Sequence, residues 1–228
     1  VGFWDCLFEG KLNEFYSYTV LNLRGAEQGV VEGSWLTFFP WILWNFPVYL
    51  THTSPANMQV DSMTCVLWAK LFLLLCVFGI AFYAYKIVLF VSKGDQKSAF
   101  IAAILASGGG ELLNCVAYVG QDEIVYLLCL MIAIYCVLKG KRRVFLFWGM
   151  VAVTICPIML LPFIAIVLYF EKNILKDIFY VGVAGVPSVL FEVVYRNDEM
   201  YQAVKDTNTI GVLNQMMNGE LLSTTFGA

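Results

Sequence analysis

The sequence predicts an all-α fold, a polytopic bundle of transmembrane helices with short and broken helices near the outer face. Of the 228 residues, 60% are hydrophobic and 14% are charged, whereas a soluble domain has about 45–50% apolar and about 25% charged residues. The apolar residues also gather in runs that short charged segments separate, and about 20 apolar residues suffice to cross a bilayer. We therefore expect lipid to be the solvent of most of this chain.

Residues 1–62 are predicted to form a loop on the outer face of the membrane. Residues 1–34 are too rich in acidic and polar side chains to span a bilayer. Residues 35–50 are apolar but contain Pro40 and Pro47, and prolines disfavour a straight spanning helix. Because the three tryptophans of this segment suit the headgroup region, we interpret it as an interfacial or re-entrant element, with a broken spanning helix as the alternative.

Residues 63–195 are predicted to form the transmembrane helical bundle. Its spans are expected near residues 63–91, 99–119, 124–138, 144–155, 157–170 and 178–195. Cys156 and Pro157 separate two spans of about 13 residues each, or roughly 20 Å, which form either a short hairpin or one long, kinked helix. Residues 196–228 are polar enough to be a second outer-face loop or a tail.

The basic loops predict an orientation. Loops rich in Lys and Arg stay on the cytoplasmic side, which places residues 92–97, 139–143 and 171–177 inside. All three can be inside together only if residues 144–170 cross the membrane and return, so this rule favours the hairpin. The remaining connections are neutral or acidic near the membrane, and they then face outside, as does any functional surface.

One candidate site lies between the second and third predicted spans. Gln121, Asp122 and Glu123 stand beside apolar segments, where acidic and amide groups are costly and tend to mark binding sites. We interpret them as candidate substrate-binding residues. The alternative is an ordinary solvated turn, whose acids the dipole of the following helix would favour.

Other candidates lie at the start of the chain and in the first secure span. Asp5 and Glu9 could supply a general base or a metal ligand in an outer loop, or they could belong to an ordinary polar segment. Lys70 lies about two turns into a span that begins outside. Its side chain either snorkels to the interface or contacts an anionic lipid phosphate.

Several classes of function are excluded. The net charge of −3 and the lack of a basic stripe on any soluble segment exclude nucleic acid as a partner. The seven cysteines show no CxxC or Cys/His spacing and His52 is the only histidine, so spacing predicts no metal site. The signatures GxGxxG, GxSxG, HExxH and the phosphate loop are also missing. Because the chain opens on Val1, one expectation is an upstream segment that contains a further transmembrane helix.

A series of short motifs runs through the chain. It consists of Asp5-Cys-Leu-Phe-Glu-Gly-Lys-Leu-Asn-Glu-Phe-Tyr16, Phe39-Pro-Trp41, Gly120-Gln-Asp-Glu-Ile-Val-Tyr126, Leu138-Lys-Gly-Lys141, Trp148-Gly149, Leu160-Leu-Pro162-Phe163 and Phe170-Glu-Lys-Asn-Ile-Leu-Lys176. The series resembles polytopic bacterial glycosyltransferases of the GT-C class, which take a sugar from a polyprenyl-phosphate carrier. The resemblance covers roughly residues 1–200.

The resemblance implies a mannosyltransferase-like enzyme, or a fragment of one, in the bacterial plasma membrane with an extracytoplasmic active face. In that class an outer-loop acid acts as base or binds a divalent metal ion. Asp5 is the nearest match to this acid and Glu9 a weaker one, and Asp122 corresponds approximately to the aspartate of the family's GQ-x-D loop. The implied partners are the lipid bilayer, a polyprenyl-phosphate sugar donor, and a glycan or glycolipid acceptor.

The chain departs from the family pattern in two respects. Cys156 stands where the family usually has a lysine before the proline, and the chain is about half the usual length. The alternative function is a non-catalytic membrane protein, such as a transporter of lipid or small solutes or a subunit of a larger complex. Transporters often contain broken helices, and the segments around Pro40 and Pro157 are consistent with this alternative.

Overall fold

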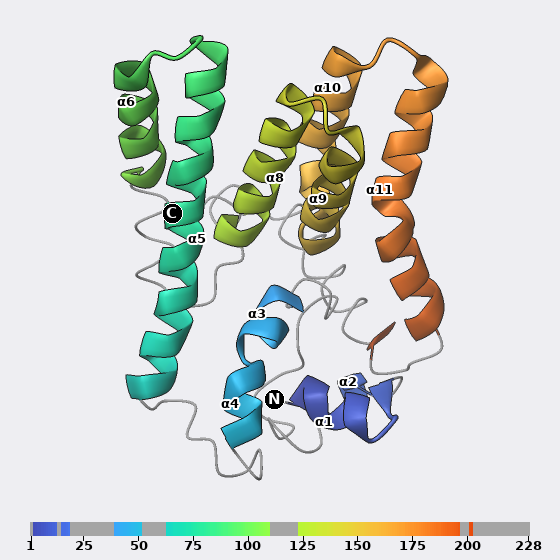
Figure 1. The fold of residues 1–228 in the computed structure, drawn as a ribbon. Coiled ribbons are helices and arrows are strands. Elements are labelled where there is room, and N and C mark those ends of the chain that lie inside the picture. The colour runs from blue at the N-terminus through green and yellow to red at the C-terminus, as the bar shows by residue number, and fades with distance from the viewer. Residues whose placement is uncertain are drawn as a thin grey trace, which may run out of the picture. The chain divides into compact units, whose positions relative to one another are not determined.

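The computed structural model describes residues 2–12, 15–18, 39–51, 63–109, 123–196 and 201–202. This part of the chain is all-helical and contains no β-strand. Its helices are α1 (Gly2–Phe8), α2 (Phe15–Tyr18), α3 (Phe39–Trp44), α4 (Phe46–Thr51), α5 (Met63–Val91), α6 (Gln96–Ser107), α8 (Glu123–Leu138), α9 (Arg142–Ile155), α10 (Leu160–Phe170) and α11 (Ile174–Tyr195) (Figure 1).

The chain divides into two compact units, which we describe separately. Unit 1 comprises Val1–Trp35, Trp41–Met58 and Leu190–Ala228, and unit 2 comprises Leu36–Pro40 and Gln59–Val189. Most of the helical residues belong to unit 2, whereas unit 1 contains the short helices near the start of the chain and the last turn of α11.

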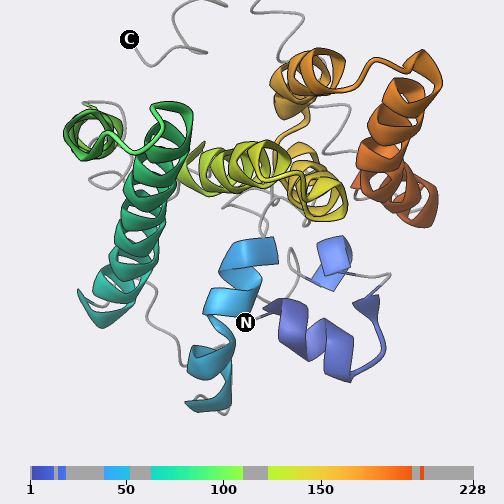
Figure 2. The ribbon, with the colours of Figure 1, turned by 45° about the horizontal axis from the view of Figure 1, so that its top comes forward.

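Unit 2 is built around a row of neighbouring helices. Helix α5 packs against both α6 and α8, and α8 in turn packs against α9, so that α8 lies between α5 and α9 (Figure 2). The buried residues shared by α8, α9, α10 and α11 are Ile132, Ala133, Cys136, Phe145, Val153, Phe163, Val167 and Ala184. Small residues on α8 and α11 let the large rings of α9 and α10 fill this core.

The boundaries of α5 agree with the predicted span at residues 63–91. Its 29 residues measure about 44 Å at 1.5 Å per residue, which exceeds the roughly 30 Å of a bilayer core. The chain then turns sharply at Gly94, whose φ of 106° lies in the left-handed region that suits glycine. Asp95 caps α6 by accepting a hydrogen bond from the backbone N–H of Lys97.

The structure describes only the first part of the predicted span near residues 99–119. Helix α6 begins at Gln96 and ends at Ser107, and Gly108 and Gly109 are not helical. Each glycine costs a helix about 1 kcal/mol relative to alanine, so the run of glycines that begins at Gly108 is a natural place for the helix to end. The rest of the predicted span lies outside the described residues.

Helices α9 and α10 form the predicted hairpin. Helix α9 ends at Ile155, and the extended backbone of Cys156 leads through a 3-10 turn, Pro157–Met159, into α10. The rings of Phe145 and Phe163 stack with centroids 5.1 Å apart. The two helices therefore run side by side in opposite directions, which excludes the alternative of one long, kinked helix.

The predicted loop at residues 171–177 is shorter than expected. Only residues 171–173 are non-helical, because the side chain of Asn173 accepts a hydrogen bond from the backbone N–H of Leu175 at 3.0 Å and caps α11. Asp177, which was expected in the loop, is a buried residue of the first turn of α11.

The three charged connections of unit 2 meet at one end of it. The Lys139 ammonium lies 4.3 Å from the ring centroid of Phe90, near the end of α5. The Arg142 guanidinium, at the start of α9, forms an ion pair of 2.6 Å with the carboxylate of Glu171, just after α10. We call residues 92–97, 139–143 and 171–177 together the basic end; Figure 1 shows their turns toward the same, upper end of unit 2.

Two helices of the described part are long and apolar enough to cross a membrane. They are Val66–Val91 within α5 and Ile174–Tyr195, which is α11. Only 22% and 17% of the most apolar stretch of each is buried inside the protein, whereas the core helix of a soluble protein is mostly buried. Their exposed surface is apolar, which is the surface that lipid would cover.

The aromatic-proline segment forms two helices of six residues each, α3 and α4. Each is about 9 Å long, too short to span a bilayer alone. In unit 1, the indole of Trp4 donates a hydrogen bond of 3.0 Å to the carbonyl of Ile42, and its ring lies 4.5 Å from that of Phe46. Helix α1 therefore packs against this segment.

Candidate functional site

The core of unit 1 is aromatic and joins the two ends of the chain. The ring of Tyr16 in α2 lies 5.3 Å from that of Tyr195 and 5.2 Å from that of Tyr201, and Phe191 packs against both of the latter. All four side chains are buried. The Tyr195 hydroxyl donates a hydrogen bond of 2.7 Å to the carbonyl of Leu12, which ties the start of the chain to the end of α11.

A cavity of about 390 Å³ adjoins this core, and Glu192, Val193, Arg196 and Gln202 line it. Its volume is within the range of about 300–1,000 Å³ that is usual for small-molecule sites. Glu192 and Arg196 are four residues apart, the spacing that places two side chains on the same face of a helix. The cavity thus combines one carboxylate and one guanidinium at the end of α11.

Hydrogen bonds hold the side chains of Glu192 and Gln202 in this cavity. The hydroxyl of Tyr201 donates to Oε2 of Glu192 at 2.8 Å, and Nε2 of Gln202 donates to the backbone carbonyl of Arg196 at 3.2 Å. A carboxylate held in this way can accept a proton from a hydroxyl. A guanidinium binds phosphate through several N–H groups and keeps its charge at all relevant pH values.

The Tyr201–Glu192 contact predicts a pH dependence of unit 1. Burial of Tyr201, and secondarily its hydrogen bond to the Glu192 carboxylate, raise its pKa to about 12, compared with about 10 for an unfolded tyrosine. A raised pKa means that the folded state favours the neutral phenol. The resulting stabilisation is complete below pH 10 and is lost as the pH rises from 10 to 12.

This dependence can be measured by tyrosine absorbance during an alkaline titration. The difference between the wild-type protein and Tyr201→Phe is expected to titrate with a midpoint near pH 12. In a Glu192→Gln background the midpoint should move toward 10, because the neighbouring negative charge is gone. A wild-type difference curve centred on pH 10 would contradict the contact.

The structure describes the predicted catalytic residues unequally. Asp5 lies in α1, but its side chain is outside the described part. Glu9 follows α1, and its carboxylate forms an ion pair of 3.0 Å with Lys11. Both partners are about half exposed, so this is a surface pair of small energetic value.

The predicted substrate-binding residues do not form a described site. Gln121 and Asp122 lie outside the described residues, and Glu123 is the first residue of α8, with a side chain that is likewise not described. Lys70 is a half-buried residue of α5 in unit 2, whereas Asp5 belongs to unit 1. Among the described residues, no three His, Cys, Asp or Glu side chains are grouped as a metal site requires.

Sequence reasoning did not select Glu192 and Arg196. A sequence feature that points to Glu192 does exist. Glu192 is the single acidic residue within the predicted span at 178–195, and an ionisable group inside an apolar span is a candidate site. Its spacing of four residues from Arg196 would have strengthened the case. The roles of Tyr201 and Gln202 depend on how the chain folds back after α11, which the sequence pattern does not specify.

Within the described residues, the fold is all-helical, two helices are long and apolar enough to cross a membrane, and a cavity with charged lining residues adjoins the end of one of them. Comparison of the chain with models of known protein families, with curated proteins and with solved structures finds no match.

Proposed function

We propose that the chain is an integral membrane protein, a polytopic helical bundle with its basic end in the cytoplasm. Positively charged connections stay on the cytoplasmic side, and the three charged connections of unit 2 lie together at one end. Helix α11 begins at this end and finishes in unit 1. A spanning α11 puts its two ends on opposite faces, so the cavity at Glu192 is extracytoplasmic.

We further propose that the protein, or the larger protein of which it is part, is a glycosyltransferase. It moves a sugar from a polyprenyl-phosphate donor to an envelope glycan or glycolipid at the outer face of a bacterial plasma membrane. The cavity that both Glu192 and Arg196 line is the observation that carries this proposal. The motif resemblance described above supports the same class of reaction.

The two charged groups suit the two halves of glycosyl transfer. The Glu192 carboxylate takes the proton of the acceptor hydroxyl. At the same time, a bond forms between the oxygen of that hydroxyl and the anomeric carbon of the sugar. The bond from that carbon to the phosphate oxygen breaks, and the lipid phosphate leaves as an anion. Arg196 stabilises the charge that develops on this leaving phosphate.

Transfer of sugar from a polyprenyl-phosphate donor in liposomes tests this proposal. Glu192→Gln is expected to lower the rate by about 10²–10⁴-fold, the usual contribution of a general base. Glu171→Gln is the matched control, because it removes a carboxylate at the basic end and leaves the cavity intact. Asp5→Asn, measured in parallel, tests the residue that the resemblance favours as base.

The outcomes separate the parts of the proposal. Undiminished transfer by Glu192→Gln together with loss in Asp5→Asn would move the role of base to Asp5. If neither substitution affects a measurable wild-type rate, neither carboxylate is the base. A wild-type protein that transfers no sugar from any polyprenyl-phosphate donor would contradict the proposed activity itself.

A second candidate function, transport of a lipid or small solute, is favoured by a different cavity. Unit 2 contains an apolar cavity of about 180 Å³ between the start of α3, the second half of α9 and Pro187 of α11. Transporters often place such sites where helices are broken. Mass spectrometry of co-purified lipids distinguishes the two: a bound polyprenyl phosphate supports the enzyme, whereas its absence together with solute flux supports transport.

A further inference from the structure

The charges of the sequence are distributed very unevenly. The basic end contains eight Lys or Arg residues and three acidic residues, an excess of five positive charges, whereas the rest of the chain has six basic and fourteen acidic residues. The eight basic residues are Lys93, Lys97, Lys139, Lys141, Arg142, Arg143, Lys172 and Lys176. All eight are exposed. An acidic protein therefore presents one strongly basic surface.

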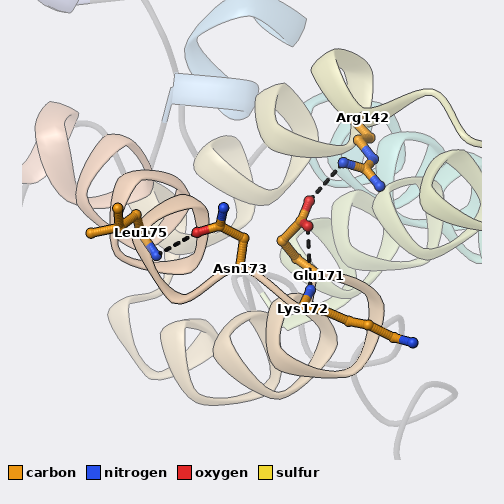
Figure 3. A network of polar contacts seen from close by, with 5 residues as sticks. All are labelled: Arg142, Glu171, Lys172, Asn173 and Leu175. Atoms are coloured by element: carbon orange, nitrogen blue, oxygen red, sulfur yellow. Dashed lines mark hydrogen bonds and ion pairs between the residues drawn. The ribbon is translucent and has the colours of Figure 1, made fainter.

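Two of these cations hold the surface together. Arg142 pairs with Glu171, and a second oxygen of the same carboxylate accepts a hydrogen bond from the backbone N–H of Lys172 at 3.2 Å (Figure 3). The ammonium of Lys139 lies over the rings of Phe90 and Tyr135, 4.3 Å and 5.8 Å from their centroids. These contacts join the ends of α5, α8, α9 and α10, so that all three turns form one surface.

The remaining six cations make no ion pair within the described part of the chain. They are Lys93, Lys97, Lys141, Arg143, Lys172 and Lys176. Like charges placed together without acidic partners repel one another, which costs free energy unless an anion binds. The surface is therefore suited to a polyanionic partner.

Large exposed apolar side chains lie within three residues of these cations along the chain. Val91 at the end of α5 is 64% exposed, Tyr169 near the end of α10 is 81% exposed, and Leu175 at the start of α11 is 73% exposed. A polyanion dissolved in water would leave these side chains uncovered, whereas the acyl chains beneath lipid headgroups would cover them. Cations next to an apolar and aromatic belt are typical of the headgroup region of a bilayer.

We propose that the basic end is a binding surface for the headgroups of anionic phospholipids in the leaflet that it faces. The six unpaired cations contact the lipid phosphates, and the adjoining apolar side chains lie among the upper acyl chains. Each Lys or Arg near an anionic membrane surface contributes on the order of a fivefold gain in lipid binding. This inference does not depend on the glycosyltransferase activity.

Lipid competition in detergent tests the proposal. The purified full chain is mixed with equal amounts of phosphatidylglycerol and phosphatidylcholine, and native mass spectrometry counts the bound molecules of each. We expect the anionic lipid to be enriched on the wild-type protein. Because each cation contributes about fivefold, the enrichment should fall on the order of a hundredfold after Lys141→Gln, Arg143→Gln and Lys172→Gln together. A control with Lys11→Gln, Arg24→Gln and Lys205→Gln loses the same charge from residues outside the three segments of the basic end and should keep the wild-type enrichment.

Salt provides a second test that needs no variant. In 1 M NaCl the screening length falls to about 3 Å, so wild-type enrichment should fall at least several-fold. Absence of enrichment on the wild-type protein, its persistence in 1 M NaCl, or an equal loss in the control variant would each overturn the proposal.

Discussion

Replacement of Gly149 by alanine is expected to destabilise the α9–α10 hairpin strongly. Gly149 is a buried residue of α9, and a methyl group added there would overlap the ring of Phe163 in α10. Phe163 is itself fully buried, so its ring has no open space to move into. Overpacking of this kind costs about 1–3 kcal/mol, which corresponds to a fall of about 2–12 °C in Tm for a protein of this size. Thermal unfolding of the wild-type protein and of Gly149→Ala in detergent measures this fall in Tm.

Gly185→Ala in α11 is the matched control. An added methyl group at Gly185 meets no atom within 4 Å, so the ordinary preference of helices for alanine over glycine applies and Tm should stay or rise. Adding Phe163→Leu to Gly149→Ala removes the ring from the overlap and should restore part of the loss. A Gly149→Ala protein as stable as Gly185→Ala would contradict the packing of the hairpin.

Tyr195→Ala is expected to loosen unit 1 while unit 2 stays folded. The Tyr195 side chain is 2% exposed, packs against Tyr16 and Tyr201, and bonds to the carbonyl of Leu12. Truncation of a large buried ring to alanine costs about 3–5 kcal/mol. This loss of folding free energy falls on unit 1, because Tyr16, Tyr201 and Leu12, which Tyr195 contacts, all belong to that unit.

The thiol of Cys6 reports this loosening. Cys6 lies in α1 and is fully buried in unit 1, so it reacts with a maleimide only when the unit opens. A loss of 3 kcal/mol should raise its labelling rate on the order of a hundredfold, as located by peptide mass spectrometry. Tyr169→Ala is the control, since the Tyr169 side chain is 81% exposed. Equal labelling of Cys6 in the wild-type protein and in Tyr195→Ala would show that the tyrosine does not hold the unit together.

Much of unit 2 could be predicted because its elements are determined by local signals. The long apolar run of α5, which only Lys70 and Lys86 interrupt, and the proline after Cys156 mark the long helix and the hairpin turn without reference to the rest of the fold. The rule that basic loops share one side of the membrane also favoured the hairpin before any contact was known. The structure places Arg142 beside Glu171, as that hairpin requires.

Other features depend on side-chain contacts that a pattern of apolar residues does not reveal. The start of α11 is moved to Ile174 by the cap from Asn173, although the charged residues that follow resemble a loop. The cavity at Glu192 requires Tyr201 to fold back onto the helix. Our sequence reasoning weighted acids near the predicted outer loops, and it therefore selected Asp5 and Asp122 and passed over Glu192.

The hydrogen bond from Tyr195 to Leu12 has a consequence for synthesis of the protein. Its two residues are 183 positions apart, and a ribosome adds about 5–20 residues per second. Tyr16 therefore waits roughly 10–40 s for Tyr195 and Tyr201, the two late residues that its ring contacts in the folded unit.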